Sequence, residues 1–282
     1  MSVTGIEAAL RLFSAEPIES FACDLLSQSP HAQIWRVQGL GHDWVLRLGL
    51  ANNEVTRARW RLEATIQQHA AAAGIAPRVV GIDLAGPALL MEYVPGGDFS
   101  TRIEDPANDP HLAQSLRILH QLPLAESTAA EAWDWESILQ AYLTHPTVAR
   151  QPLSQDLMAL LKPFLATASQ REPALVHHDP HAKNWLIQGH ALLIDWEYAA
   201  PNDPLFDLVA VARYHGWSRT RCEAWLNHYG FTGTWREFAN LSLLFDALHW
   251  LWCTRYDRFE TMPTALKQNV EARLSSAYPH FE

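Results

Sequence analysis

The sequence contains little cysteine. Only Cys23, Cys222 and Cys253 occur among its 282 residues, and no two of them are close together. Such a set builds neither a disulfide framework nor a zinc site with closely spaced ligands. We therefore expect a protein of a reducing compartment, the cytoplasm.

Long apolar runs and an excess of positive charge are also missing. No stretch of about 18 apolar residues suggests a membrane span. The first residues, Met1–Glu7, lack the basic start and apolar core of a signal peptide. The sequence has 21 Lys and Arg against 31 Asp and Glu, a formal net charge of −10. This balance argues against nucleic acid or a membrane as a partner, because nucleic acids and anionic membranes both select basic surfaces.

The sequence does contain a dense polar stretch, VHHDPHAKN at 176–184, followed by IDWE at 194–197. Phosphoryl transfer from a nucleotide needs a base at the attacking hydroxyl and oxygen ligands for the magnesium ion that bridges the phosphates. Asp179 can accept the proton of the hydroxyl. Asn184 and Asp195 offer the hard oxygen atoms that magnesium prefers. The pattern predicts an enzyme that uses ATP and Mg²⁺.

The spacing of these residues is explained by a hairpin. Two short apolar runs, 185–187 and 191–194, are separated by Gln188-Gly189-His190, a loop that contains glycine. Folding the chain there places Asn184 opposite Ile194. We therefore expect Asp195 to emerge beside Asn184, at the same end of the hairpin as Asp179.

The order His177, Asp179, Asn184, hairpin, Asp195 resembles the catalytic loop and metal-binding segment of the protein-kinase-like superfamily. The stretches LIDWEY at 193–198 and NDPLFDL at 202–208 are similar to the choline kinase, ethanolamine kinase and bacterial thiamine kinase families, within the wider aminoglycoside phosphotransferase family. The resemblance implies that Asp179 is catalytic, that His177 braces the catalytic loop and that Asn184 and Asp195 bind the metal. It also implies that Asp207 ties its helix to that loop.

The distribution of elements agrees with the two-lobed α+β fold that the resemblance implies. Short β-prone runs and one long helical stretch, 53–73, fill the first third of the chain, and the sequence after about residue 105 is mostly helical. Between them, VPGGD at 94–98 is the sharpest break. We expect a small β-rich nucleotide-binding lobe over 1–94 and a larger helical catalytic and substrate lobe over 95–282. The helices are expected at 110–121, 131–144, 154–169, 204–215, 219–229, 234–257 and 263–276.

The expected nucleotide site in the first lobe rests on the same resemblance. Arg47 takes the place of the basic residue that binds phosphates, with Glu63 as its helix partner and Glu54 as the alternative. Backbone groups near Glu92 and Tyr93 are expected to contact adenine. The loop expected to cover the phosphates, 27–33, contains no glycine, so Ser27 and Ser29 are expected to offer hydroxyl groups in place of closely approaching amides.

Acidic and aromatic residues indicate a cationic acceptor. Asp195 and Glu197 are two apart, so in extended chain they point the same way. The sequence has 12 Trp, and the late helix carries Trp250, Trp252 and Tyr256. The residues Phe245, His249, Trp252 and Tyr256 recur at i, i+4, i+7 and i+11 and so share one helix face, whereas Trp250 lies on a second face with Asp246. Aromatic faces with nearby carboxylates attract cations. We expect a small cationic alcohol that binds to Glu197 and these aromatic residues.

Two other functions stay open from the sequence alone. An aminoglycoside- or sugar-type phosphotransferase would share the catalytic residues and differ in the acceptor pocket. A nucleotide-binding pseudoenzyme is favoured by the glycine-poor loop and opposed by the intact Asp179, Asn184 and Asp195.

Overall fold

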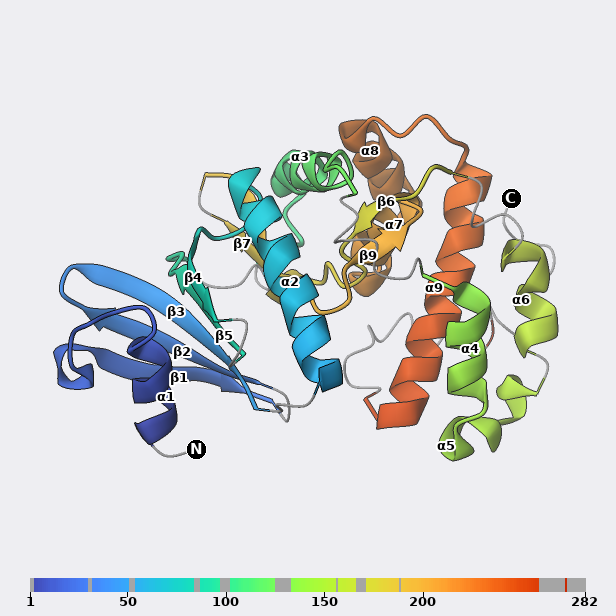
Figure 1. The fold of residues 1–282 in the computed structure, drawn as a ribbon. Coiled ribbons are helices and arrows are strands. Elements are labelled where there is room, and N and C mark those ends of the chain that lie inside the picture. Colours follow the sequence, from blue (N-terminus) through green and yellow to red (C-terminus); the bar gives the residue numbers. More distant parts are fainter. Residues whose placement is uncertain are drawn as a thin grey trace. The chain divides into compact units, whose positions relative to one another are not determined.

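The structure is a computed structural model, and it describes residues 3–29, 32–50, 54–83, 87–96, 102–124, 133–155, 157–165, 171–187, 189–258 and 272. The chain divides into two compact units, Met1–Gly97 with Leu186–Glu197, and Asp98–Trp185 with Tyr198–Glu282. A β-sheet unit followed by a helical unit confirms the predicted α+β class (Figure 1). One segment, Leu186–Glu197, was expected in the C-terminal lobe but groups with the N-terminal unit, where Leu193 N donates to Ile75 O at 2.8 Å.

The N-terminal unit is built around one antiparallel sheet with strand order β1-β2-β3-β5-β4. Its strands and helices are α1 Val3–Leu10, β1 Ala22–Gln28, β2 Ala32–Gly39, β3 His42–Gly49, α2 Glu54–Ala72, β4 Val79–Asp83 and β5 Ala88–Glu92. Consecutive side chains of a strand point to opposite faces. On one face Leu46 and Leu90 pack with Leu10 of α1, and on the other Met91 packs with Trp60 of α2. Arg47 alternates with Leu46 and therefore lies on the α2 side.

The C-terminal unit is dominated by helices. Its elements are α3 Asp109–Leu119, α4 Trp135–Leu143, α5 Pro146–Ala149, α6 Leu157–Leu165, β6 Ala174–Val176, β9 Ala200–Asn202, α7 Leu205–Tyr214, α8 Arg219–Tyr229 and α9 Trp235–Tyr256. The long helix α9 starts with a capping box in which Thr234 and Glu237 satisfy each other's backbone N–H groups. Its contact with α7 includes Arg213, whose guanidinium donates to both oxygens of the fully buried Asp246 at 2.8 and 3.0 Å.

Two small two-stranded sheets position the polar residues of the stretches 176–184 and 194–197. The strands β6 and β9 pair antiparallel, with Val176 opposite Ala200, so the segment after β6 and the segment before α7 leave the same small sheet. The predicted hairpin is present as β7 Trp185–Ile187 paired with β8 Ala191–Leu193. Gly189 in its loop has φ +74°, a conformation that favours glycine. Asn184 directly precedes β7, and Asp195 follows β8 by two residues.

Several element boundaries differ from the sequence predictions for identifiable reasons. Of the loop predicted at 27–33, residues 27–28 belong to β1 and residues 32–33 to β2, and residues 30–31 lie outside the described residues. Helix α4 starts at Trp135, since the Asp134 side chain caps its N-terminus. Within the stretch 154–169 the structure describes the helix α6, residues 156 and 166–169 lie outside the described residues, and Pro152–Ser154 is a 3₁₀ turn. The predicted helix 263–276 lies outside the described residues except for residue 272.

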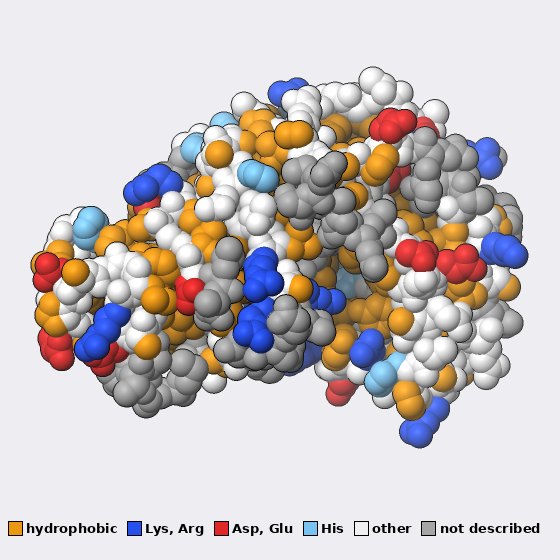
Figure 2. Space-filling model, viewed as in Figure 1, with side chains coloured by type: hydrophobic (Ala, Val, Ile, Leu, Met, Phe, Trp, Pro, Cys, Tyr) orange, Lys and Arg blue, Asp and Glu red, His pale blue; other side chains and the backbone are white. Residues whose placement is uncertain are grey.

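On the face drawn in Figure 2, several Lys and Arg side chains gather near the middle of the view, and the others are scattered among apolar and uncharged side chains of the described part. Within that part of the chain, no helix combines the length and apolar character that a membrane span requires.

Candidate active site

The catalytic loop predicted after β6 is anchored by Asp207 in the first turn of α7. Its fully buried carboxylate accepts hydrogen bonds from His177 N at 2.8 Å and from His178 N at 2.9 Å. His120 Nε2 lies 3.1 Å from the same carboxylate, and His120 Nδ1 lies 2.8 Å from Tyr229 Oη. Burial opposes ionisation of Asp207, but the His120 hydrogen bond and the neighbouring histidines outweigh it and lower the pKa of this carboxyl. Asp207 therefore joins α3, α7, α8 and the loop.

His178 is a structural residue of the loop. Its φ of +68° is unusual for a residue with a side chain. Its Nδ1 lies 2.9 Å from Tyr198 O and its Nε2 lies 2.9 Å from Asn202 Nδ2, while the ring stacks on Trp133 at 3.9 Å. A carbonyl accepts and an amide nitrogen donates, so these partners select the neutral ring with the proton on Nδ1. Burial lowers the pKa of His178 to about 4, which agrees with that neutral form.

The carboxylate of Asp179, the predicted base, has donors on both oxygens. Tyr214 Oη donates to Oδ1 at 2.7 Å, and Asn184 Nδ2 donates to Oδ2 at 3.2 Å. His181 Nε2 lies 3.6 Å from Oδ2. The backbone N–H of Asp179 donates to Nδ1 of the buried His177 at 3.3 Å.

Asn184 is fixed by a short 3₁₀ turn, Ala182–Asn184, just before β7. Its amide nitrogen also donates to Asp179 O at 2.9 Å, and the next residue, Trp185, donates from Nε1 to Pro180 O at 2.9 Å. These bonds use the nitrogen of the Asn184 amide and leave its carbonyl oxygen as the atom suited to a cation.

Asp195 and Glu197 are both exposed, with the buried Trp196 between them. The reason is not the extended chain assumed from the sequence, because Asp195 has φ +67°. Left-handed non-glycine residues cost energy and cluster at functional sites. Asp195 Oδ1 lies 3.9 Å from Nη2 of Arg47, within the N-terminal unit.

Arg47 and Glu63, predicted as partners, form a largely buried ion pair. Nη1 of Arg47 lies 2.9 Å from both carboxylate oxygens, and its guanidinium lies 4.9 Å from the centre of the Trp60 ring. Burial raises the pKa of Glu63 to about 7, Arg47 opposes that rise, and Asp195 and Glu197 add to it. The alternative partner, Glu54, has its side chain outside the described residues.

The charges of this cluster suit a divalent cation. Glu63 and Asp195 both lie near the guanidinium of Arg47, and the negative charges of Asp195 and Glu197 both raise the pKa of Glu63. No group of three His, Cys, Asp or Glu side chains in the described ranges could hold a metal by itself. Magnesium usually takes one or two protein oxygens together with nucleotide phosphates and water. The carboxylate of Asp195 and the carbonyl of Asn184 fit that requirement chemically.

Ser29 lies in the turn between β1 and β2, and its hydroxyl is engaged across that turn. Ala32 N donates to Ser29 Oγ at 3.0 Å, and Ser29 N donates to Ala32 O at 2.9 Å. The side chain therefore joins the end of β1 to the start of β2. A phosphate contact by this hydroxyl would replace its 3.4 Å contact with Ala32 O and keep the bond that it accepts from Ala32 N.

Glu92 and Tyr93 follow β5, where adenine contacts are expected. Glu92 forms an ion pair with Arg78, and the guanidinium of Arg36 lies 3.8 Å from the centre of the Tyr93 ring. Both residues line a cavity of about 410 Å³ in the N-terminal unit, with Arg78 and His190 also in its wall. Neither Arg47 nor Glu63 lines it.

The aromatic face predicted on α9 exists and leads to the base. Phe245 and His249 contact the ring of Tyr214 at 5.0 and 5.2 Å between centroids. The series continues from His249 to Trp252 at 6.4 Å and from Trp252 to Tyr256 at 5.6 Å. Because Tyr214 donates to Asp179, the stripe Phe245, His249, Trp252, Tyr256 begins at the predicted catalytic residue.

Trp250 does not share this face. A helix turns by 100° per residue, so Trp250 lies about 160° away from Trp252 and on the side of Asp246. It is only 3% exposed. The structure thus brings Trp252 and Tyr256 together and separates Trp250 from them.

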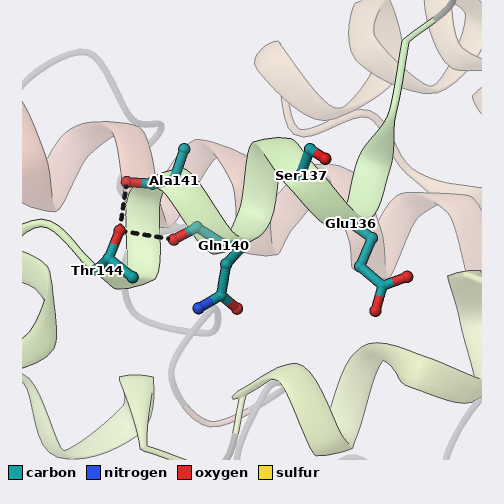
Figure 3. A pocket seen from close by; sticks show the side chains of 5 residues that line it. All are labelled: Glu136, Ser137, Gln140, Ala141 and Thr144. Carbon is teal, nitrogen blue, oxygen red and sulfur yellow. Dashed lines mark hydrogen bonds between the residues drawn. The ribbon is translucent and has the colours of Figure 1, made fainter.

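A second hollow, of about 440 Å³, lies along α4 and shares no residue with the predicted site (Figure 3). Its described wall comprises Glu136, Ser137, Gln140, Ala141 and Thr144, with Thr144 Oγ1 donating to Gln140 O at 2.9 Å.

Sequence reasoning missed Tyr214, His120 and Trp133. For Tyr214 a signal exists, because it follows Asp207 by seven residues, two helical turns, and so lies on the same face of α7 toward the catalytic loop. His120 and Trp133 are brought to Asp207 and His178 by tertiary folding alone, and no local pattern indicates them.

Comparison with known proteins relates the whole chain to phosphate-transferring enzymes. The model of the phosphotransferase enzyme family matches residues 27–241, well over half of the chain. A choline/ethanolamine kinase family protein from Mesorhizobium loti has a similar structure, with a TM-score of 0.71 and 20% identity over 99% of this chain and 97% of that one. Choline kinase LicA from Streptococcus pneumoniae also has a similar structure, with a TM-score of 0.71 and 17% identity over 98% of this chain and 100% of that one.

An antibiotic-modifying enzyme is about as similar. The macrolide 2'-phosphotransferase MphH from Brachybacterium faecium has a TM-score of 0.66 and 19% identity, over 98% of this chain and 99% of that one. At such identities the likeness establishes the fold. No curated protein matches the sequence at a level that indicates a relative.

Proposed function

Because the chain belongs to the phosphotransferase enzyme family, we propose that it transfers the γ-phosphate of ATP to the hydroxyl group of a small cationic alcohol of the choline, ethanolamine or thiamine type. The observation that carries the proposal is the environment of Asp179, a carboxylate oriented by Tyr214 and Asn184 at the start of an aromatic face. Transfer to a hydroxyl acceptor is the activity of the family, and the cationic acceptor is the specific part of the proposal.

Each residue of the site has a separate task in this proposal. Asp179 accepts the proton of the acceptor hydroxyl as its oxygen attacks the γ-phosphorus. Arg47, fixed by Glu63, contacts the phosphate oxygens of the nucleotide. Asn184 and Asp195 bind magnesium, which when present neutralises the phosphate charge. Glu92 and Tyr93 lie at the segment proposed to bind adenine, and structures of similar fold have been solved with AMP and with ADP.

The acceptor class is inferred from charge and aromatic character. Trp252 is half-buried and Tyr256 is 49% exposed, so both rings have surface available to a ligand. Each contact between an aromatic face and a quaternary or ring cation contributes about 0.5–2 kcal/mol to the binding free energy. Glu197 supplies a carboxylate in the N-terminal unit. Trp250 is buried on the other side of α9, so we do not include it in the proposed acceptor site.

An acceptor screen tests the proposal. Purified protein with Mg²⁺ and ATP is incubated with choline, ethanolamine, thiamine, a neutral sugar alcohol, an aminoglycoside and a macrolide, and phosphorylated products are detected by mass spectrometry. We expect product from at least one of the three cationic alcohols and none from the sugar alcohol. A macrolide or neutral sugar as the best acceptor would replace the cationic-alcohol assignment while leaving Asp179, Asn184 and Asp195 in place.

Two variants test the recognition residues. Glu197→Gln keeps the size and removes the charge, so the acceptor KM should rise more than the ATP KM. Trp252→Leu should raise the acceptor KM by up to roughly thirtyfold, the equivalent of about 2 kcal/mol. Trp250→Leu is the matched control, since it should lower stability without raising the acceptor KM. Equal KM effects at the two tryptophans would contradict the proposed face.

A further inference from the structure

Tyr214, the last residue of α7, makes a short hydrogen bond to the predicted base. Its hydroxyl donates to Asp179 Oδ1 at 2.7 Å, whereas Asn184 Nδ2 donates to Oδ2 at 3.2 Å. With one donor on each oxygen, the carboxylate plane cannot rotate without loss of a hydrogen bond. Each carboxylate oxygen accepts at more than one position, so both donors are compatible with a further hydroxyl at Asp179.

Packing fixes the Tyr214 ring independently of Asp179. His181 meets it edge-on at 5.7 Å and 82°, Phe245 at 5.0 Å and 86°, and His249 at 5.2 Å and 67°. Rings in these edge-to-face arrangements are in favourable contact. Because three neighbours set the orientation of the phenol, the position of its hydroxyl is determined by α7 and α9. Tyr214 thus imposes an orientation on the carboxylate.

The hydroxyl is also a permanent donor. Burial raises the pKa of Tyr214 well above its ordinary value, and the negative charge of Asp179 adds to the shift. The phenol therefore keeps its proton over the working range of an enzyme.

We infer that Tyr214 is a positioning residue for phosphoryl transfer, which holds Oδ1 of Asp179 in the orientation that receives the acceptor's proton. This inference rests on the proposed function. In the reaction the acceptor oxygen forms its bond to the γ-phosphorus, the bond from that phosphorus to the leaving oxygen of ADP breaks, and the acceptor proton moves to Asp179. Tyr214 also connects the base to the Phe245–His249 end of the aromatic face.

A double-mutant cycle tests the inference with four proteins: wild type, Tyr214→Phe, Asp179→Asn and the double variant. Phenylalanine keeps the ring and its packing and removes only the hydroxyl. We expect Tyr214→Phe to lower kcat by about 10- to 100-fold, the range for a hydrogen bond to a charged group, with the KM for ATP unchanged. In the Asp179→Asn background the same change should lower the residual kcat by less than about twofold, because coupled residues are not additive.

Tyr229→Phe is the matched control. It removes a phenol hydroxyl that lies 2.8 Å from His120 Nδ1 in the same unit and makes no bond to Asp179. Its effect on kcat should be the same factor in both backgrounds. The same constant factor for Tyr214→Phe would overturn the inference, because a purely structural role does not depend on the carboxylate.

The failure of the proposed function gives a different result. If the wild type transfers phosphate to no hydroxyl acceptor, the positioning role is overturned with it. A urea-unfolding cycle on the same four proteins then still reports the contact itself, since Tyr214 and Asp179 should be non-additive in stability whether or not the protein is active. Additive stability effects would contradict the hydrogen bond.

Discussion

At the scale of single residues, the candidate site depends on side chains whose positions are fixed by several neighbours. Asp195 has left-handed backbone geometry and lies 3.9 Å from Arg47, and Asn184 uses its amide nitrogen twice within the catalytic loop. A residue that is conformationally costly yet exposed suggests a function for its carboxylate. In our proposal that function is magnesium binding.

Substitution of Asp195 should therefore remove the effect of magnesium on nucleotide binding. Calorimetric titration of a non-hydrolysable ATP analogue, with and without Mg²⁺, should show tighter binding with the metal in the wild type and no difference in Asp195→Ala. Asn184→Ala should show a reduced difference. Asp24→Ala, an exposed aspartate on β1, is the control and should behave as the wild type. A metal effect of wild-type size in Asp195→Ala would mean that the metal is bound elsewhere.

At the scale of elements, α7 organises the catalytic loop through Asp207. This fully buried carboxylate accepts from two consecutive backbone N–H groups and from His120, and it links α3 and α7 to the loop. A buried carboxylate that accepts several hydrogen bonds contributes more to stability than one hydrogen bond between neutral groups, so its removal costs more free energy of unfolding.

Asp207→Asn should lower the free energy of unfolding by about 3 kcal/mol, since each hydrogen bond to a charged group contributes about 1.5–3 kcal/mol and the amide can replace only part of them. Urea unfolding monitored by tryptophan fluorescence measures the change. Asp257→Asn is the matched control, because it has the same chemistry at an exposed C-cap with φ +52°, where asparagine is tolerated. Similar losses at both positions would contradict the role of Asp207.

The same scale shows what the sequence could predict. The helices α7, α8 and α9 and the hairpin β7–β8 lie within a residue or two of their predicted bounds, because periodicity, caps and the loop glycine act locally. The strand β1 was missed because its residues are almost all exposed and lack alternation. The contact of Asp179 with Tyr214 and the turn closed by Ser29 depend on tertiary packing, which leaves little local signal.

The candidate catalytic and metal-binding residues Asp179, Asn184 and Asp195 could be predicted from their residue types and spacing. The pairing of Arg47 with Glu63 follows from a family resemblance, and the two side chains do lie in contact. The division of the late tryptophans follows from helical periodicity in the sequence, which puts Trp252 and Trp250 on different faces. Which of the two faces is buried, and that Trp252 lies toward Tyr214 through His249, follows only from the folded unit.

At the scale of the whole molecule, buried histidines make stability depend on pH. Burial lowers the pKa of His178 to about 4, and burial with Arg213 and His181 lowers the pKa of His249 to about 4. In the unfolded chain a histidine has a pKa of about 6.5. Below that value the unfolded state binds protons that the folded state does not, so stability is lost as the pH falls.

Each of these two histidines should therefore lower the free energy of unfolding by up to about 3 kcal/mol as the pH falls from about 6.5 to 4. Glu63, whose pKa in the folded protein is raised to about 7, contributes in the opposite sense, because the stability it provides when protonated is lost as the pH rises through about 7. Urea unfolding at half-unit pH steps measures the profile. His249→Gln cannot gain a charge, so its profile should be shallower over the same interval. A slope equal to that of the wild type would show that His249 is not a source of the pH dependence.

The central claim for the molecule is that it is a phosphotransferase with Asp179 as its base, and comparison of Asp179→Asn with the wild type tests it most directly. Phosphate transfer to the best acceptor of the screen and the affinity for the ATP analogue are measured on the same two preparations. The account predicts a kcat lower by about 10²- to 10⁴-fold, with nucleotide affinity unchanged, because a positioned base contributes that factor and does not bind phosphate. Retention of more than about half of the wild-type rate by Asp179→Asn would contradict it.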